Sequence, residues 1–181
     1  MFKRLLFGCL RMFFSAFYDV KYLRGKWFQG FTGYNWCLKS LIFCKLFRLG
    51  KSYPFPASYK IRVSDPQNII FHPEDIAIFQ SEGCYYQNFS AKIYIGRGSY
   101  IAPNVGIITA NHDPEDLSKH FPGRDVHIGD GCWIGMNSII LPGVSLAKGV
   151  IVGAGSVVTK SFDSPGVVIA GNPARVIKAS K

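Results

Sequence analysis

An aliphatic residue recurs every six positions through the second half of the chain. The main series is Ile128, Ile134, Ile140, Leu146, Val152 and Val158, and an earlier run is Ile95, Ile101 and Ile107. A period of six is typical of a parallel β-helix, whereas the apolar residues of an α-helix recur every three to four positions. An ordinary β-sandwich gives scattered alternation and does not explain nine aliphatic residues in phase.

This period has a direct physical interpretation. Each unit of six residues supplies one short strand and one corner, and three units close a coil of roughly 18 residues. The aliphatic side chain of each unit points inward and stacks on its equivalents in the neighbouring coils. Cys132 falls on an inward position of the repeat and is interpreted as a small core residue.

The repeat is interrupted between Ile107 and Ile128, which lie 21 positions apart, a distance that is not a multiple of six. We therefore predict an inserted loop at about residues 108–126. Loops on rigid scaffolds commonly carry function, and the base of this one holds His112, a residue type suited to general-base catalysis. A surface histidine without a role explains the spacing equally well.

Positive charge is concentrated in the first third of the chain. Residues 1–64 hold 12 Lys and Arg against a single acid, a net charge of +11, while the other 117 residues carry 9 basic and 10 acidic side chains. The same segment holds 17 of the 27 aromatic residues. This asymmetry indicates an anionic partner surface, and no nucleic-acid-binding motif accompanies it.

Two amphipathic helices are predicted in this basic segment. The first lies within residues 2–18 and is too short and too charged to span a bilayer. The second runs from Trp36 to Leu49, with Asn35 as its N-cap. Such helices can lie in a membrane interface, so residues 1–50 are a candidate contact with an anionic membrane. The alternative is that they cap the open end of the β-helix.

The cysteines indicate neither disulfides nor a metal site. They are odd in number, scattered and without metal-ligand spacing: Cys9, Cys37, Cys44, Cys84 and Cys132. We expect reduced thiols, no metal, and a cytoplasmic protein that is peripheral at the inner membrane face. The predicted domains are a helical extension, residues 1–64, and a β-helix with a C-terminal tail, residues 65–181. Residues 51–75 are predicted to connect them.

Several characteristic strings follow one another in the second half: Ile101–Val105, Asn111-His112, Val126–Gly135, Ile140–Val144, Gly153–Lys160 and Ala170–Lys178. With these strings, the chain from about Asn88 to Lys178 resembles the hexapeptide-repeat acyltransferases. The branch it is most similar to holds maltose, galactoside, nodulation-factor and surface-polysaccharide O-acetyltransferases. The resemblance implies a left-handed parallel β-helix, a homotrimer, and acetyl-CoA bound between neighbouring subunits.

The resemblance also implies roles for individual residues. His112 matches the general base, and Asn88 resembles a residue that contacts the acceptor sugar, although this match requires a six-residue deletion before Ile95. Trp133 matches an aromatic residue near the cofactor and the subunit interface. Two further positions match backbone contacts to pantetheine: Met136 and Ala154. Four others resemble the residues around the nucleotide and its phosphates: Thr159, Lys160, Arg175 and Lys178.

The sequence therefore predicts an enzyme. We expect acetyl-CoA-dependent O-acetylation of a surface-polysaccharide sugar or its precursor, by direct transfer without a metal. Asp113 follows His112, and the loop to Val126 is shorter than in the maltose-type enzymes, so their small-sugar specificity does not transfer. The alternatives are an O-acetyltransferase of a small soluble acceptor (a free sugar, serine or an antibiotic) and a non-catalytic β-helix scaffold. The acceptor and the acyl group remain open.

Overall fold

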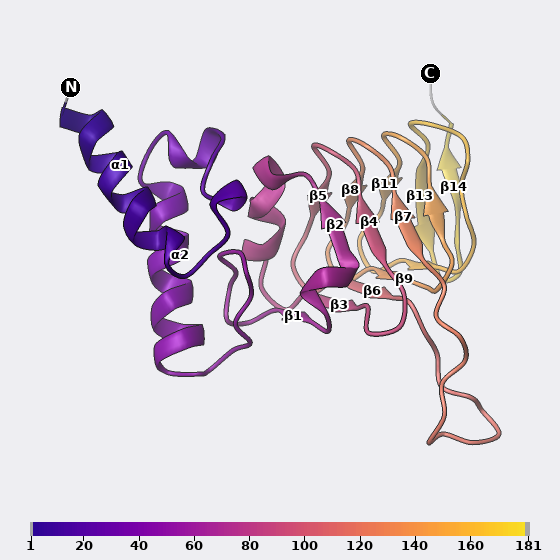
Figure 1. Ribbon diagram of the computed structural model, residues 1–181. Coiled ribbons are helices and arrows are strands. Elements are labelled where there is room, and N and C mark those ends of the chain that lie inside the picture. The colour runs from indigo at the N-terminus through magenta and orange to yellow at the C-terminus, as the bar shows by residue number, and fades with distance from the viewer. Residues whose placement is uncertain (1, 180–181) are drawn as a thin grey trace. The chain divides into compact units, whose positions relative to one another are not determined.

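A computed structural model describes residues 2–179, except for the side chain of Phe2 (Figure 1). The outermost residues of the two predicted domains, Met1 and residues 180–181, lie outside this range. The chain divides into two compact units. One comprises Met1–Ile61 with Pro73–Glu82, and the other comprises Arg62–His72 with Gly83–Lys181.

The second unit is built from short strands in three sheets. Sheet I contains β1 (Arg62–Val63), β3 (Tyr85–Gln87), β6 (Gly106–Ile108), β9 (Ile139–Ile140) and β12 (Val157–Val158). Sheet II contains β2 (Ile69–Phe71), β4 (Ile93–Ile95), β7 (Val126–Ile128) and β10 (Ser145–Leu146). Sheet III contains β5 (Tyr100–Ile101), β8 (Trp133–Ile134), β11 (Ile151–Val152), β13 (Val168–Gly171) and β14 (Ala174–Lys178).

The chain visits the three sheets in turn and comes back to each in parallel register. Ile139 pairs with Val157, and Trp133 pairs with Ile151, so each strand pairs with the strand that follows it by three repeat units. This confirms the predicted three-sided coil. For brevity, the corners that lead from sheet I to sheet II are called the I–II edge, and those from sheet III to sheet I the III–I edge.

The repeat positions form the core of this unit. All nine aliphatic residues of the two series are buried, with at most 5% of any side chain exposed. Cys132 is also fully buried, as predicted, and burial raises the pKa of its thiol. The neighbouring strand residues Ile139 and Trp133 point outward and are more exposed. Alternation along two-residue strands is therefore enough to separate the core from the surface.

The first and last coils depart from the regular pattern. The coils begin at Arg62, inside the segment predicted as a connector. In the first coil no strand joins sheet III among the described residues, and the chain between β2 and β3 contains the 3₁₀-helical segment Pro73–Gln80 instead. The predicted C-terminal tail is a strand: β14 turns back and pairs antiparallel with β13, which covers the edge of sheet III.

The first unit is helical (Figure 1). It contains α1 (Phe2–Ser15), η1 (Val20–Tyr22), η2 (Lys26–Phe28), α2 (Thr32–Ser40) and the π-helical turn η3 (Leu41–Leu46). Its buried cluster consists of Phe14, Tyr18, Leu23, Phe28, Tyr34 and Cys37. None of the described helices combines the length and the apolar composition needed to cross a bilayer.

The predicted bounds of the second helix were wrong at both ends. The helix begins at Thr32, and the backbone N–H of Asn35 donates to the carbonyl of Phe31 at 2.8 Å, so Asn35 lies inside the first turn. Gly33 in the first turn packs against Phe28, and an added Cβ there would lie 2.7 Å from that ring. The helical conformation ends at Leu46, and Arg48 has a φ of 55°, which no right-handed helix accommodates.

The stacked core makes a sharp test of the coil register possible. Replacing Ile140 by Asp puts an unpaired charge among buried aliphatic residues and should lower the free energy of unfolding by about 4 kcal/mol or more. Ile139→Asp, one residue earlier on the same strand, is the matched control, because that side chain points outward. Denaturant unfolding followed by circular dichroism measures both. Equal stability of the two variants would contradict the register.

Candidate active site

The inserted loop leaves the coil at the I–II edge and folds back on itself as a two-stranded ribbon (Figure 1). The N–H of Asp113 donates to the carbonyl of Lys119 at 3.0 Å, and that of Phe121 donates to Asn111 at 2.9 Å. At its base, the N–H of Arg124 donates to Thr109 at 2.8 Å. This register places His112 opposite His120.

His112 is held by the loop that carries it. Its Nδ1 lies 2.8 Å from the carbonyl oxygen of Leu117. A carbonyl only accepts, so Nδ1–H is the donor and Nε2 of the neutral ring is left as an acceptor. The ring centroid lies 4.0 Å from that of His120, and the His120 centroid lies 5.1 Å from that of Phe89 in a T-shaped pair. His112 is exposed and orientated, which suits a base that removes a proton from an incoming hydroxyl.

The base of the ribbon is fixed by Gln87, at the end of β3 in the preceding coil. Its Oε1 accepts from the backbone N–H groups of Thr109 and Ala110, both at 3.0 Å, and its Nε2 donates to the carbonyl of Ala110 at 3.0 Å. Sequence reasoning did not identify Gln87, and it did not pair His120 with His112. Gln87 could have been suspected because it is a polar side chain at the end of the strand that precedes, by one coil, the strand from which the inserted loop leaves.

Asn88 stands at the same edge, but its side chain is buried and turned toward the first coil. Its Nδ2 donates to the carbonyl of Asp65 at 2.7 Å, and its Oδ1 accepts from the N–H of Asp65 at 2.9 Å. The amide therefore ties two coils together. Contact with an acceptor would require it to leave Asp65, and the role assigned to Asn88 stays a prediction.

The residues predicted to bind a cofactor are all exposed, but they lie on different sides of the coil. Met136 and Ala154 occupy equivalent positions of the III–I edge in successive coils, and the N–H of Gly155 donates to the carbonyl of Met136 at 2.8 Å. Trp133 is on the outer side of sheet III and 55% exposed. The others lie after β12 at the I–II edge or on β14: Thr159, Lys160, Arg175 and Lys178.

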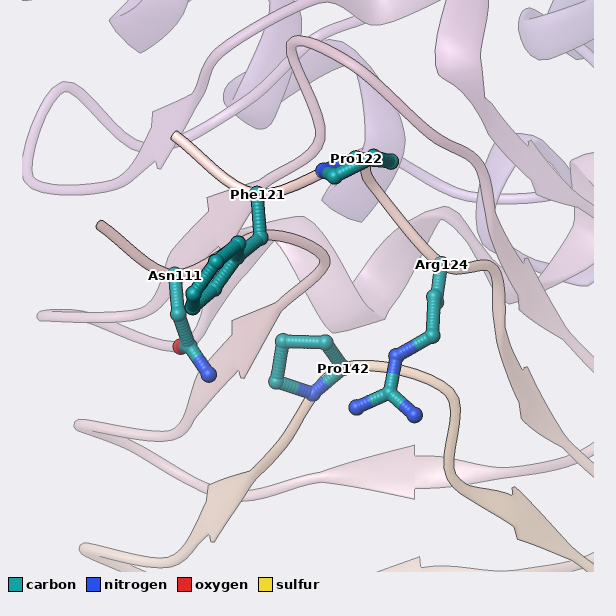
Figure 2. A pocket seen from close by; sticks show the side chains of 5 residues that line it. All are labelled: Asn111, Phe121, Pro122, Arg124 and Pro142. Carbon is teal, nitrogen blue, oxygen red and sulfur yellow. The ribbon is translucent and has the colours of Figure 1, made fainter. Parts of the chain in front are cut away.

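A hollow of about 350 Å³ lies beside the ribbon (Figure 2). It is lined by Asn111, Phe121, Pro122, Arg124 and Pro142. Successive residues of an extended strand point to opposite faces, so Asn111 and Phe121 face away from the pair His112–His120. The ribbon thus has two faces, one with the imidazoles and one with the hollow.

Acidic side chains of the loop are occupied by local contacts. Asp116 accepts from the Ser118 hydroxyl at 2.6 Å and pairs with Lys119 at 2.9 Å, and these contacts lower the pKa of its carboxyl. The Oδ1 of Asp113 accepts from the N–H of Glu115 at 2.9 Å. Across residues 2–179, no three His, Cys, Asp or Glu side chains gather in a metal-binding arrangement.

Comparison with known proteins identifies the repeat. Residues 125–160 match the family model described as bacterial transferase hexapeptide (six repeats). Residues 125–160 thus carry the repeat of the bacterial hexapeptide transferases. The galactoside O-acetyltransferase of Escherichia coli K12 is 39% identical over 106 residues, which cover 52% of this chain and 50% of that protein.

Two solved structures extend the likeness of the repeat domain. A maltose O-acetyltransferase from Clostridium difficile 630 is 39% identical with a TM-score of 0.50, over 68% of this chain and 60% of that one. A hexapeptide-repeat acetyltransferase from Vibrio cholerae, solved with acetyl-CoA, has a TM-score of 0.52 at 24% identity, over 67% and 69% of the chains, and shows the fold alone. The chain spans about half the length of the curated relatives it matches.

The ring pair makes a structural prediction for the loop. Replacing His120 by Ala removes the ring that packs on His112 and should speed hydrogen exchange of the ribbon amides about threefold to tenfold, because such ring pairs contribute about 0.5–1.5 kcal/mol. His120→Phe should retain most of the protection. The control is His127→Ala, whose ring stacks on Tyr94 in sheet II, at 4.5 Å. Unchanged exchange in His120→Ala would show that the contact between the rings of His112 and His120 does not order the loop.

Proposed function

We propose that this protein is an acetyl-CoA-dependent O-acetyltransferase that acts on a hydroxyl of a surface-polysaccharide sugar or of its precursor. The observation that supports it best is the geometry of His112, an exposed residue whose Nδ1 is tied to the carbonyl of Leu117. A neutral imidazole fixed in this tautomer is a ready proton acceptor. The family of the repeat domain supplies the reaction class.

The proposed transfer is direct. Nε2 of His112 takes the proton of the acceptor hydroxyl as its oxygen attacks the thioester carbonyl carbon. The tetrahedral oxyanion that forms collapses, the C–S bond breaks, and the imidazolium returns the proton to the departing thiolate. The Leu117 carbonyl stabilises the transient imidazolium through Nδ1–H. Correct alignment of the two substrates lowers the barrier without a covalent enzyme intermediate.

The cofactor contacts belong to the same proposal. Met136 and Ala154 expose backbone at one corner of successive coils, where the amides of pantetheine can pair with it. Lys160, Arg175 and Lys178 supply exposed cations suited to the phosphates of CoA. Thr159 precedes Lys160 in the chain, and Trp133 is the proposed aromatic contact near the cofactor and the subunit interface.

We further propose a left-handed coil assembled as a homotrimer. The base lies on the I–II edge, whereas the proposed pantetheine contacts lie on the III–I edge and Trp133 on sheet III. In a trimer, His112 of one copy would face a cofactor bound mainly by its neighbour. The division into an extension of residues 1–64 and a catalytic domain of residues 65–181 remains part of this proposal, as does a cytoplasmic, membrane-peripheral location.

The helical unit supports contact with an anionic membrane. Helix α1 packs Phe14 into the buried cluster, yet it exposes a second apolar stripe that includes Leu5, Met12 and Phe13, each more than half exposed. Leu46 and Phe47 are similarly exposed at the end of η3. These side chains lie in the segment that carries the +11 charge, and each Lys or Arg near an anionic leaflet contributes about 1 kcal/mol.

The base assignment is tested by comparing His112→Ala with His127→Ala, an exposed histidine on β7. Release of free CoA thiol with a panel of glycan, free-sugar and serine acceptors measures turnover. His112→Ala should lose about 10²–10⁴ of the rate while keeping its CoA affinity, and His127→Ala should retain its rate. Undiminished turnover in His112→Ala would refute the base, and absence of CoA binding by the wild type would favour a non-catalytic scaffold.

Membrane contact is tested with the double variant Met12→Glu, Phe13→Glu. Both side chains are exposed, whereas deleting residues 1–18 would also remove Phe14 and Tyr18 from the core. Sedimentation with phosphatidylserine vesicles should weaken by about tenfold or more, since burying each apolar side chain contributes about 1.5–3 kcal/mol. Ile70→Glu on β2 is the control. Unchanged sedimentation with a lower melting temperature would favour the capping role instead.

A further inference from the structure

The hollow on the second face of the ribbon has the chemistry of a sugar subsite. Figure 2 shows the Asn111 amide and the Arg124 guanidinium on either side of the Pro142 ring, with the Phe121 ring beside Asn111. The ring of Phe121 is 49% exposed and offers an apolar surface to the C–H face of a pyranose. The volume of the hollow, about 350 Å³, suits a single sugar residue rather than a longer segment of glycan.

In the part of the chain that the structure describes, Arg124 is the only charged residue that lines this hollow. Its backbone is fixed to Thr109, and its guanidinium lies against the turn at Gly143, where an added Cβ would stand 3.2 Å from Cζ, Nε and Nη1. Gly143 has a φ of 82°, a conformation that favours glycine, and the missing Cβ leaves room for the guanidinium.

The guanidinium has no anionic partner among the described residues. The neighbouring Asp125 accepts from the backbone N–H of Lys92 at 2.8 Å, and Asp116 at the ribbon tip pairs with Lys119. An unpaired Arg in a hollow with an amide and an aromatic ring is suited to a carboxylate, which its fork can bind through two parallel hydrogen bonds.

We propose that this hollow binds a carboxylate-bearing sugar of an acidic glycan acceptor, an inference that rests on the proposed acetyltransferase function. Arg124 holds the carboxylate, Phe121 packs on the ring, and Asn111 bonds a hydroxyl. Because His112 faces the other side of the ribbon, the bound sugar is a neighbour of the residue that reacts. The subsite therefore contributes to acceptor binding and not to the chemical step.

The test uses two probes that differ by one acidic sugar, 3′-sialyllactose and lactose. Saturation-transfer NMR and titration calorimetry with the full chain should show about tenfold tighter binding of sialyllactose, the size expected of a charged hydrogen-bonded pair. Arg124→Gln should abolish this preference and Arg124→Lys should retain part of it. Lys92→Gln removes an equal charge from a residue outside the hollow and should leave the preference unchanged.

Turnover and CoA binding separate the possible failures. Arg124→Gln should raise KM for sialyllactose about tenfold with kcat unchanged, and leave the CoA Kd and the melting temperature as in the wild type. Equal binding of the two sugars by the wild type, no binding of either, or a preference that survives in Arg124→Gln would overturn the subsite. A weakened CoA Kd would overturn it in favour of a phosphate contact. An Arg124-dependent preference without turnover would keep the subsite and refute only the acetyltransferase function.

Discussion

Parallel pairing between successive coils is the constraint on which the rest of the repeat domain depends. Each coil must deliver its next strand in register, or the aliphatic side chains around Ile140 would no longer stack. Gly106 pairs with Ile139 in the next coil although the whole inserted loop lies between them in the chain, so the insertion leaves the register unchanged. This is tolerated because the ribbon closes on itself: Arg124 returns to Thr109, and the coil continues as if nothing had been added.

The regular part of the fold could be predicted because one short period specifies both strand and corner. The early coils could not, since Arg62 pairs with Tyr85 and Tyr85 pairs with Gly106, and neither spacing is a multiple of the period. There the buried Tyr86 takes the place of an aliphatic residue, so a search for aliphatic residues at a fixed spacing does not detect this position. The second helix was located, but its bounds were not predicted; its first turn packs Gly33 against Phe28, a contact that the local sequence pattern does not show.

Prediction of the candidate site had a similar limit. The resemblance pointed to His112, but the ring beside it is set by ribbon register, which no local pattern in residues 109–124 reveals. The backbone bonds from Phe121 to Asn111 and from Asp113 to Lys119 bring His120 opposite His112, and alternation along each strand turns the neighbouring side chains to the other face. Matching Asn88 by sequence likewise does not show that its amide is engaged with Asp65.

The separation of the predicted site residues bears on assembly. A coil whose core is a continuous stack of buried aliphatic residues has no hinge, so the I–II edge that carries His112 cannot bend toward Met136 and Ala154 at the III–I edge. In the proposed mechanism a second copy must therefore supply what one coil keeps apart. Trimerisation and catalysis are then a single proposal. An isolated coil would keep its fold, its ribbon and its orientated imidazole, yet it would hold the base and the thioester on different sides of the β-helix.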